Sequence, residues 1–218
     1  MISSFRSPLP SSHFIVSGKC REFYSKGGLE MERAFYERHT VTVAQDLIGC
    51  LLIRRGFSGL EDIVVRITET EAYRGADDPA SHAHRGVTPR NRLMFGQAGH
   101  LYVYLSYGMH YCMNIVTEGE GEPGAVLLRG AEVVQGLELV RANRPGVRDA
   151  QLLNGPGKLT KGLALDLAYN GYDVCGGFGG GELELLPPPT GMRPLPLKET
   201  GRIGISKGQA MPWRFVEG

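Results

Sequence analysis

The sequence predicts an α+β fold: a single compact domain built on a mostly antiparallel, curved β-sheet with surrounding helices. The chain has 218 residues, of which 42% are hydrophobic and 22% are charged, so one ordinary globular core is expected. Segments with strand character come early in the chain and return late. Helical segments lie between them without a regular strand–helix–strand alternation, and this order favours an antiparallel sheet over a parallel one.

Helices are expected at three places. Thr42 and Gln45 have the spacing of a capping box, and Gly49 is expected to end the helix that begins there. Residues 132–143 carry an apolar stripe at helical spacing. A Gly-Pro-Gly segment at residues 155–157 is expected to open a further short helix, because proline is favoured at the first helical position.

Strands are expected where short apolar runs, rich in β-branched and aromatic residues, lie between turn signals. Gly108 separates two of these runs, and glycine-containing segments at residues 56–59 and 176–181 mark further turns. In chain order, the expected strands are residues 50–54, 63–72, 101–107, 111–116, 125–131 and 183–186.

The first thirty residues differ in composition from the rest of the chain. They are rich in Ser, Pro, Gly and basic residues, and their first acidic residue is Glu22. They lack the apolar core of a secretory signal peptide. We expect residues 1–30 to be a disordered tail, or translated sequence upstream of a native start at Met31, and residues 31–218 to form the folded domain. Organellar targeting by residues 1–30 is an open alternative.

Motifs and composition exclude several kinds of site. The four cysteines lie far apart, and His82-Ala-His84 has no third ligand at a set spacing, so no metal site is expected. No glycine-rich nucleotide-binding loop occurs in the sequence, and no cofactor is expected. No apolar run has the length and purity of a membrane span.

The expected strand at residues 63–72 carries two acidic residues at an unusual place. Strict alternation puts Glu69 and Glu71 on the same face as the apolar Ile63, Val65 and Ile67. A carboxylate at the core end of such a face loses hydration, and its pKa rises unless a cation or hydrogen bonds compensate. The alternative is that the strand bends before Glu69 and both carboxylates are solvated.

A second anomaly is the absence of acidic residues between positions 79 and 117. The net charge of the chain is only +1, yet this stretch holds three arginines, four of the six histidines and four of the nine tyrosines. Cations for phosphates and rings for base stacking are typical of a nucleic-acid groove. The alternative is a core strand flanked by a basic turn, with tyrosines as ordinary strand aromatics. The candidates for contacts with a DNA backbone are Arg85, Arg90 and Arg92.

A series of short motifs runs through the chain from about Val43 to Phe215. They are Glu69-Thr-Glu71-Ala-Tyr73, Ser81-His82, Thr88-Pro-Arg-Asn91-Arg92, Met94-Phe95, Leu101-Tyr-Val-Tyr104-x-x-Tyr107-Gly-Met, Cys112-Met-Asn114, Leu127-Leu-Arg129, Gly155-Pro-x-Lys158-Leu159 and Arg202-Ile203-Gly204. In this order they resemble the alkyladenine (3-methyladenine) DNA glycosylase family. The resemblance implies a single mixed α/β domain and a monofunctional, metal-free glycosylase for alkylated or deaminated purines.

The resemblance implies catalytic roles for three residues. Glu71 matches the general base, which activates a water molecule against the N-glycosidic bond of a flipped nucleotide. Arg129 and the backbone carbonyl of Ile203 match groups that hold this water. The bond breaks through an oxocarbenium-like state, as in sugar hydrolysis, and an abasic site remains for base excision repair.

The resemblance also implies a pocket for the extruded base. Tyr73, His82 and Tyr104 match the rings that sandwich the base, and a cationic alkylpurine gains from stacking on such rings. Asn114 matches the residue that rejects guanine by crowding its exocyclic amine. Tyr107 matches a side chain that wedges into the gap left in the duplex.

The expected partner is double-stranded DNA that contains damaged purines; the expected state is a monomer without membrane association. Its expected location is the bacterial cytoplasm and nucleoid, or the nucleus if the source is eukaryotic. Two alternatives stay open: a non-catalytic nucleic-acid-binding relative of the same fold, and a hydrolase of free nucleosides or small glycosides. The first has no need of Glu71, Arg129 and Asn114 together, and the second has no need of Tyr107 as a wedge.

Overall fold

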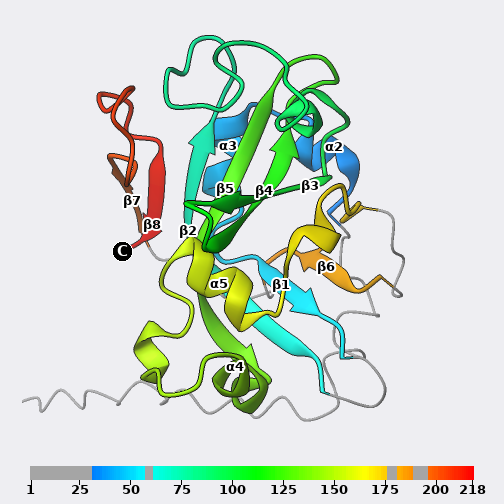
Figure 1. The fold of residues 1–218 in the computed structure, drawn as a ribbon, viewed down its shortest axis with the longest axis vertical. Coiled ribbons are helices and arrows are strands. Elements are labelled where there is room, and N and C mark those ends of the chain that lie inside the picture. Colours follow the sequence, from blue (N-terminus) through cyan, green and yellow to red (C-terminus); the bar gives the residue numbers. More distant parts are fainter. Residues whose placement is uncertain (1–30, 57–60, 176–180, 189–195) are drawn as a thin grey trace, which may run out of the picture.

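A computed structural model describes residues 31–56, 61–175, 181–188 and 196–218 of the chain. It confirms the α+β class, because these residues form one eight-stranded antiparallel sheet and four α-helices. Figure 1 shows the sheet as a curved surface with helices around it. The expectations for residues 1–30, and largely those for residues 56–59 and 176–181, fall outside the described residues.

The sheet is continuous from β3 at one edge to β6 at the other, in the order β3-β4-β5-β2-β1-β6. Strand β8 pairs with β2 and with β7, and Figure 1 shows β8 (red) alongside β2. Six of the strands confirm the predicted ones, and β7 and β8 are additional. The strands are β1 (Leu51–Arg54), β2 (Ile63–Tyr73), β3 (Leu101–Ser106), β4 (His110–Thr117), β5 (Gly124–Gln135), β6 (Leu183–Leu186), β7 (Leu197–Thr200) and β8 (Arg214–Glu217).

The α-helices of the described residues are short. They are α2 (Arg33–Tyr36), α3 (Thr40–Asp46), α4 (Leu137–Asn143) and α5 (Pro156–Gly162). Helix α5 confirms the expected helix start, with Pro156 at its first position, where the missing N–H leaves no donor unsatisfied. No helix among these residues is both long enough and apolar enough to cross a membrane.

The capping box predicted at Thr42 and Gln45 is wrong. Helix α3 begins at Thr40, two residues before Thr42, and its N-cap makes no side-chain hydrogen bond. Instead, the Thr40 N–H and the Thr40 hydroxyl both donate to Glu118 Oε1, each at 2.8 Å. Gln45 donates to Glu199 on β7. An acidic residue distant in sequence therefore satisfies this helix end, which a local pattern cannot reveal.

The helix expected over residues 132–143 is wrong in its first third. Strand β5 continues to Gln135, with side chains that alternate between partly buried and exposed, as in a strand. Val133 and Val134 are β-branched, which favours the extended conformation. Gly136 then adopts a left-handed conformation with φ 79° and caps the shorter helix α4.

The two faces of the sheet carry separate apolar clusters. Helices α3 and α5 pack on one face, over core residues that include Val103, Met113 and Leu128. The opposite face carries a smaller cluster with Tyr102 and Met94, the latter from the short 3-10 helix η1 (Arg92–Phe95). Adjacent residues of β3 and β4 divide between the two clusters, as strand alternation requires.

Paired bulges interrupt the ladder between β2 and β5. The register skips Thr68 in β2 and, directly beyond it, Arg129 in β5. Each strand thus has one extra residue without a direct partner. Such bulges bend a strand and re-aim its side chains, and they are frequent beside active sites.

The bulge reverses which side chains of β2 face the helices. Ile67 lies in the core on the helical face, but beyond the bulge it is Thr70 that faces the helices, and its hydroxyl donates to the Ala44 carbonyl of α3 at 2.7 Å. Glu69 and Glu71 therefore lie on the face opposite Ile67. The expectation that strict alternation puts Glu69 and Glu71 on the same face as Ile63, Val65 and Ile67 is wrong, because the extra residue shifts the alternation by one.

Candidate active site

A row of paired residues crosses the non-helical face of the sheet. Tyr102 of β3 pairs with Asn114 of β4, which pairs with Leu127 of β5, and Leu127 pairs with Glu71 of β2. Side chains of directly opposite residues share a face. The strand register thus brings the predicted base-selecting amide and the predicted general base onto the same surface.

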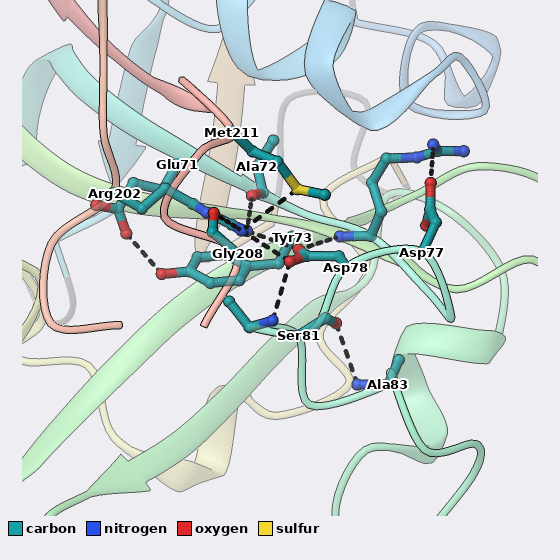
Figure 2. A network of polar contacts seen from close by, with 12 residues as sticks. Glu71, Ala72, Tyr73, Asp77, Asp78, Ser81, Ala83, Arg202, Gly208 and Met211 are labelled. Carbon is teal, nitrogen blue, oxygen red and sulfur yellow. Dashed lines mark hydrogen bonds and ion pairs between the residues drawn. The ribbon is translucent and has the colours of Figure 1, made fainter. Parts of the chain in front are cut away.

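Glu71 is fully buried and bound by three donors. Its Oε2 accepts the Tyr73 hydroxyl at 2.7 Å and Arg129 Nη1 at 3.3 Å, and its Oε1 accepts the backbone N–H of Ile203 at 2.7 Å. Figure 2 shows the Tyr73 hydroxyl pointing at this carboxylate. Burial raises the pKa of Glu71, while the charge of Arg129 and the two hydrogen bonds oppose that rise. The alternative of two solvated carboxylates is wrong for Glu71, whose exposure is 0%.

Arg129 connects Glu71 to a second carboxylate. Its Nε donates to Glu69 Oε1 at 2.9 Å, and the same oxygen accepts Arg214 Nε from β8 at 2.6 Å. Two arginines and two carboxylates thus form one continuous array. Arg214 lies outside the motif series. Its contact with Glu69 arises from the pairing of β8 with β2, which a local sequence pattern does not reveal.

A cavity of about 410 Å³ opens beside this array. That volume is within the range of small-molecule sites in proteins. All of the predicted catalytic and base-pocket residues except Glu71 line it directly, and Glu71 is held by three of those lining residues. The predicted residues that line the cavity are Tyr73, His82, Arg90, Tyr104, Tyr107, Asn114, Arg129 and Ile203.

The aromatic rings of the cavity form a compact wall on one side. The centroids of His82 and Tyr104 are 4.7 Å apart with the rings at 69°, and His82 Nδ1 lies 2.9 Å from the Tyr102 hydroxyl. Because His82 and Tyr104 already touch, a base cannot lie between these two rings. The third ring, Tyr73, comes from the end of β2, so a base would lie against the pair with Tyr73 as the other partner.

The Asn114 amide is held in a fixed orientation. Its Nδ2 donates to the Tyr102 carbonyl at 2.9 Å, and the residue is only 4% exposed. A buried amide with one donor committed to the backbone cannot swing aside at low cost. It therefore presents a rigid polar group to the cavity.

Tyr107 lies at the tip of the hairpin that joins β3 and β4. It is 85% exposed, which contradicts a role as a core tyrosine. Its φ is 50° and that of the following Gly108 is 67°. A left-handed backbone at a residue other than glycine costs on the order of 1–3 kcal/mol and is found most often at functional sites. The hairpin thus presents an exposed aromatic side chain at the cavity.

The basic turn before η1 is tied by an amide rather than by its arginines. Asn91 Nδ2 donates to the carbonyls of His82 and Gly86, and Asn91 Oδ1 accepts the Thr88 N–H. The three candidate arginines of this segment are exposed, and one of them reaches the cavity lining. They are Arg85, Arg90, which lines the cavity, and Arg92.

A buried ion pair, absent from the sequence predictions, lies behind Tyr73 (Figure 2). Arg202 binds both carboxylate oxygens of Asp78, at 2.6 and 2.7 Å, and both side chains are 0% exposed. The same guanidinium donates to the Ala72 carbonyl at 2.8 Å. Its carbon lies 4.7 Å from the centroid of the Tyr73 ring and 5.2 Å from that of Trp213.

This ion pair joins segments that are distant in sequence. Asp78 also accepts the backbone N–H groups of Arg74 and Ala80, which shapes the turn leading to His82. Arg202 directly precedes Ile203, whose N–H binds Glu71. The Arg202–Asp78 pair therefore fixes both the end of β2 and the irregular segment that carries Ile203. Among the described residues, no group of three or more His, Cys, Asp or Glu side chains is arranged to hold a metal ion.

Replacing Asp78 tests the structural weight of this pair. Asp78→Asn leaves the guanidinium of Arg202 buried without a counter-charge, and the free energy of unfolding is expected to fall by about 3–5 kcal/mol. Urea unfolding followed by circular dichroism measures this change. Asp77→Asn is the matched control: Asp77 pairs with Arg74 at the surface, and its loss is expected to cost under about 1 kcal/mol. Equal effects of the two substitutions would contradict a special structural role of the buried Arg202–Asp78 pair.

Comparisons with known proteins agree with the motif series. A family model described as methylpurine-DNA glycosylase (MPG) matches residues 34–218. A protein of Carboxydothermus hydrogenoformans is 44% identical over 185 residues, which cover 85% of this chain and 93% of that protein. A protein of Methanoculleus marisnigri is 46% identical over 192 residues, which cover 86% of this chain and 94% of that protein. Both carry the name "Putative 3-methyladenine DNA glycosylase".

These matches confirm the resemblance to the alkyladenine DNA glycosylase family that the motifs carry. They span nearly the whole described part of the chain, including both ends of the site, from Glu71 to Ile203. The chain belongs to the methylpurine-DNA glycosylase family of DNA-repair enzymes.

Proposed function

We propose that this protein excises alkylated or deaminated purines from double-stranded DNA, with Glu71 as the base that activates water. The observation that supports this most strongly is the fully buried carboxylate, bound by three donors, beside an aromatic cavity of about 410 Å³. The names of the relatives, which mention 3-methyladenine, point to the alkylated purines of this class. The active unit is residues 31–218, acting as a monomer.

The proposed reaction is hydrolysis of the bond between the base and the deoxyribose. The oxygen of water bonds to C1′ as the N-glycosidic bond breaks, and the bonding electrons leave with the base. Glu71 takes the proton from the water, and an abasic site remains. A cationic base leaves as a neutral molecule, and a neutral base leaves as an anion that takes a proton from solvent. Arg129 and the Ile203 carbonyl hold the water, in the roles that the family resemblance implies.

The hydrogen bonds of Glu71 leave one acceptor position of its carboxylate unused. A carboxylate has about four lone-pair directions, and three are used by Tyr73, Arg129 and Ile203. These donors favour the ionised carboxylate, against the effect of burial, and they fix its orientation. In the proposed reaction, the unused position on Oε1 is the one that would accept the proton of the water.

The lesion must leave the duplex to reach this site, because Glu71 is buried behind the cavity. The exposed Tyr107 at the hairpin tip would fill the gap in the base stack, and Tyr73, His82 and Tyr104 would stack on the flipped base. The exposed arginines near the cavity would bind phosphates. A non-catalytic relative has no need of a buried, triply bound carboxylate, and a nucleoside hydrolase has no need of an exposed wedge.

Glu71→Gln tests the proposal directly. The amide keeps the shape but cannot take a proton, so excision should fall by at least ~100-fold while binding to damaged duplex is retained. Single-turnover excision of hypoxanthine from a synthetic duplex measures the rate. Glu69→Gln is the control, since Glu69 contacts Arg129 but does not touch the water site, and its effect should be smaller. Turnover near the parent rate in Glu71→Gln would refute the assignment.

The pH dependence of excision should reflect the burial of Glu71. Because Glu71 must be ionised to accept a proton, the rate rises with pH through its pKa. Burial raises that pKa, so the rise should lie above the usual carboxyl value of about 4.3. Tyr73→Phe keeps the ring but removes a donor to the ionised carboxylate, and the rise should move to higher pH. A pH–rate profile that does not shift in Tyr73→Phe would contradict this role of the hydroxyl.

Asn114 is proposed as the residue that excludes guanine. Asn114→Ser removes bulk and should raise the release of undamaged guanine, relative to hypoxanthine, by roughly tenfold. Excision from matched duplexes with one target base each measures the ratio. Asn114→Gln keeps an amide and adds bulk, so this variant should not raise the ratio. A constant ratio in Asn114→Ser would exclude Asn114 as the selecting residue.

Tyr107 and Arg85 should differ in a salt titration. Arg85→Ala removes one phosphate contact and should lower the salt slope of binding by about one, without affecting flipping at saturation. Tyr107→Ala removes no charge, so the slope should stay at the parent value while base flipping becomes weaker. A 2-aminopurine placed next to the lesion reports flipping. Parent-like flipping in Tyr107→Ala would rule out the wedge.

A further inference from the structure

The charged side chains that line the cavity are two arginines, Arg90 and Arg129, and no Asp or Glu lies in its lining. Arg129 is neutralised by the carboxylates of Glu69 and Glu71. Arg90 is exposed and takes part in none of the ion pairs formed within the described residues. The cavity therefore has one uncompensated positive charge in its wall.

This charge lies on the aromatic wall rather than only at the protein surface. The Arg90 guanidinium carbon is 5.1 Å from the centroid of the Tyr104 ring, within the range of a cation–π contact. The neighbouring His82 touches the same ring. Desolvation of the imidazole, and secondarily the charge of Arg90, lower the pKa of His82, so a second positive charge at this wall is disfavoured.

We infer that Arg90 is a specificity-determining residue of the base pocket, which favours neutral lesion bases over cationic ones. The neutral class comprises deaminated purines and other uncharged adducts, and the cationic class comprises purines alkylated at a ring nitrogen. The inference rests on the proposed function, since it concerns the base that the cavity would hold.

The physical reason is a competition for the same ring electrons. A ring attracts a cation through its negative face, and the guanidinium over Tyr104 already uses part of this attraction. A cationic base against Tyr104 would also be repelled by Arg90 at short range. The aromatic composition of the pocket alone would favour cationic bases, and Arg90 offsets this preference.

The charge that develops on the departing base also makes Arg90 favour neutral lesions. A neutral base that departs with the bonding electrons gains negative charge, which a nearby guanidinium stabilises. A cationic base departs as a neutral molecule and carries residual positive charge in the transition state, which the guanidinium opposes. Arg90 should therefore favour neutral lesions in kcat/KM.

Arg90 differs from the neighbouring arginines in that it lines the cavity. Arg85 and Arg92 belong to the same basic segment and are exposed, but neither lines the cavity. Arg92 is therefore a matched control, because it is two residues away, of the same residue type, and a candidate for a phosphate contact outside the cavity. Because Arg90 is exposed, its replacement should leave the fold intact.

The experiment compares Arg90→Gln with Arg92→Gln on two duplexes that differ only in the lesion, hypoxanthine or 7-methylguanine. The measured quantity is kcat/KM relative to the parent protein, which cancels the difference in spontaneous reactivity between the two lesions. Arg90→Gln should raise the ratio of 7-methylguanine to hypoxanthine excision by about threefold to tenfold. Arg92→Gln should weaken both equally, and Arg90→Lys, which keeps the charge, should retain most of the parent ratio.

Binding to the same two duplexes in a Glu71→Gln background tests whether Arg90 selects the lesion or only contacts a phosphate. There the Arg90→Gln substitution should again shift the ratio of affinities toward the cationic lesion. An equal loss on both lesions, with a salt slope lowered by about one, would identify Arg90 as a phosphate contact and overturn the inference. A parent protein that binds both duplexes but excises neither lesion would overturn the proposed function, while the binding ratio would still decide the role of Arg90.

Discussion

The proposed reaction depends on keeping one fully buried carboxylate ionised. Removing Glu71 from water favours its protonated form, and a protonated carboxyl group cannot serve as a base. Three donors oppose this effect, and each comes from a different segment: Tyr73 from the same strand, Arg129 from β5, and the Ile203 N–H from the irregular segment near the C-terminus. The fold of the surrounding segments can be understood as the means of bringing these donors to one place.

The bulge pair is the feature of the sheet on which this arrangement depends. Without the extra residue at Thr68, alternation would point Glu71 at the helices, where the core is apolar. The extra residue opposite, Arg129, lies beside the redirected carboxylates and reaches both of them. A bulge in only one strand would turn the acids without a matching shift in the basic partner, so the two irregularities act together.

Local composition predicts most of the fold, because strand and turn signals involve residues that are close in sequence. The strands around Glu71, Tyr104 and Asn114 lie where the apolar runs indicate, and the motif series locates the lining of the cavity. The bulge is not predictable in this way, since it arises from the register between two strands. The Arg202–Asp78 pair joins residues 124 positions apart, and neither residue lies in a pattern that indicates the other. At Val133 and Val134 the local pattern itself is ambiguous, because an apolar stripe at helical spacing also fits a strand. The predicted helix therefore began too early.

The acid-free stretch from residue 79 to 117 has a physical explanation in this arrangement. It supplies ten of the eighteen residues that line the cavity, as well as the exposed arginines and the hairpin tip. An additional carboxylate in this wall would compete with Glu71 and Glu69 for Arg129, and it would repel the phosphates of a bound duplex. The negative charge of the site is thus confined to β2, where arginines hold it, and the wall that would meet the base is neutral or positive. The charge distribution along the sequence fits a separation between the part of the site proposed to remove a proton and the part proposed to receive the base.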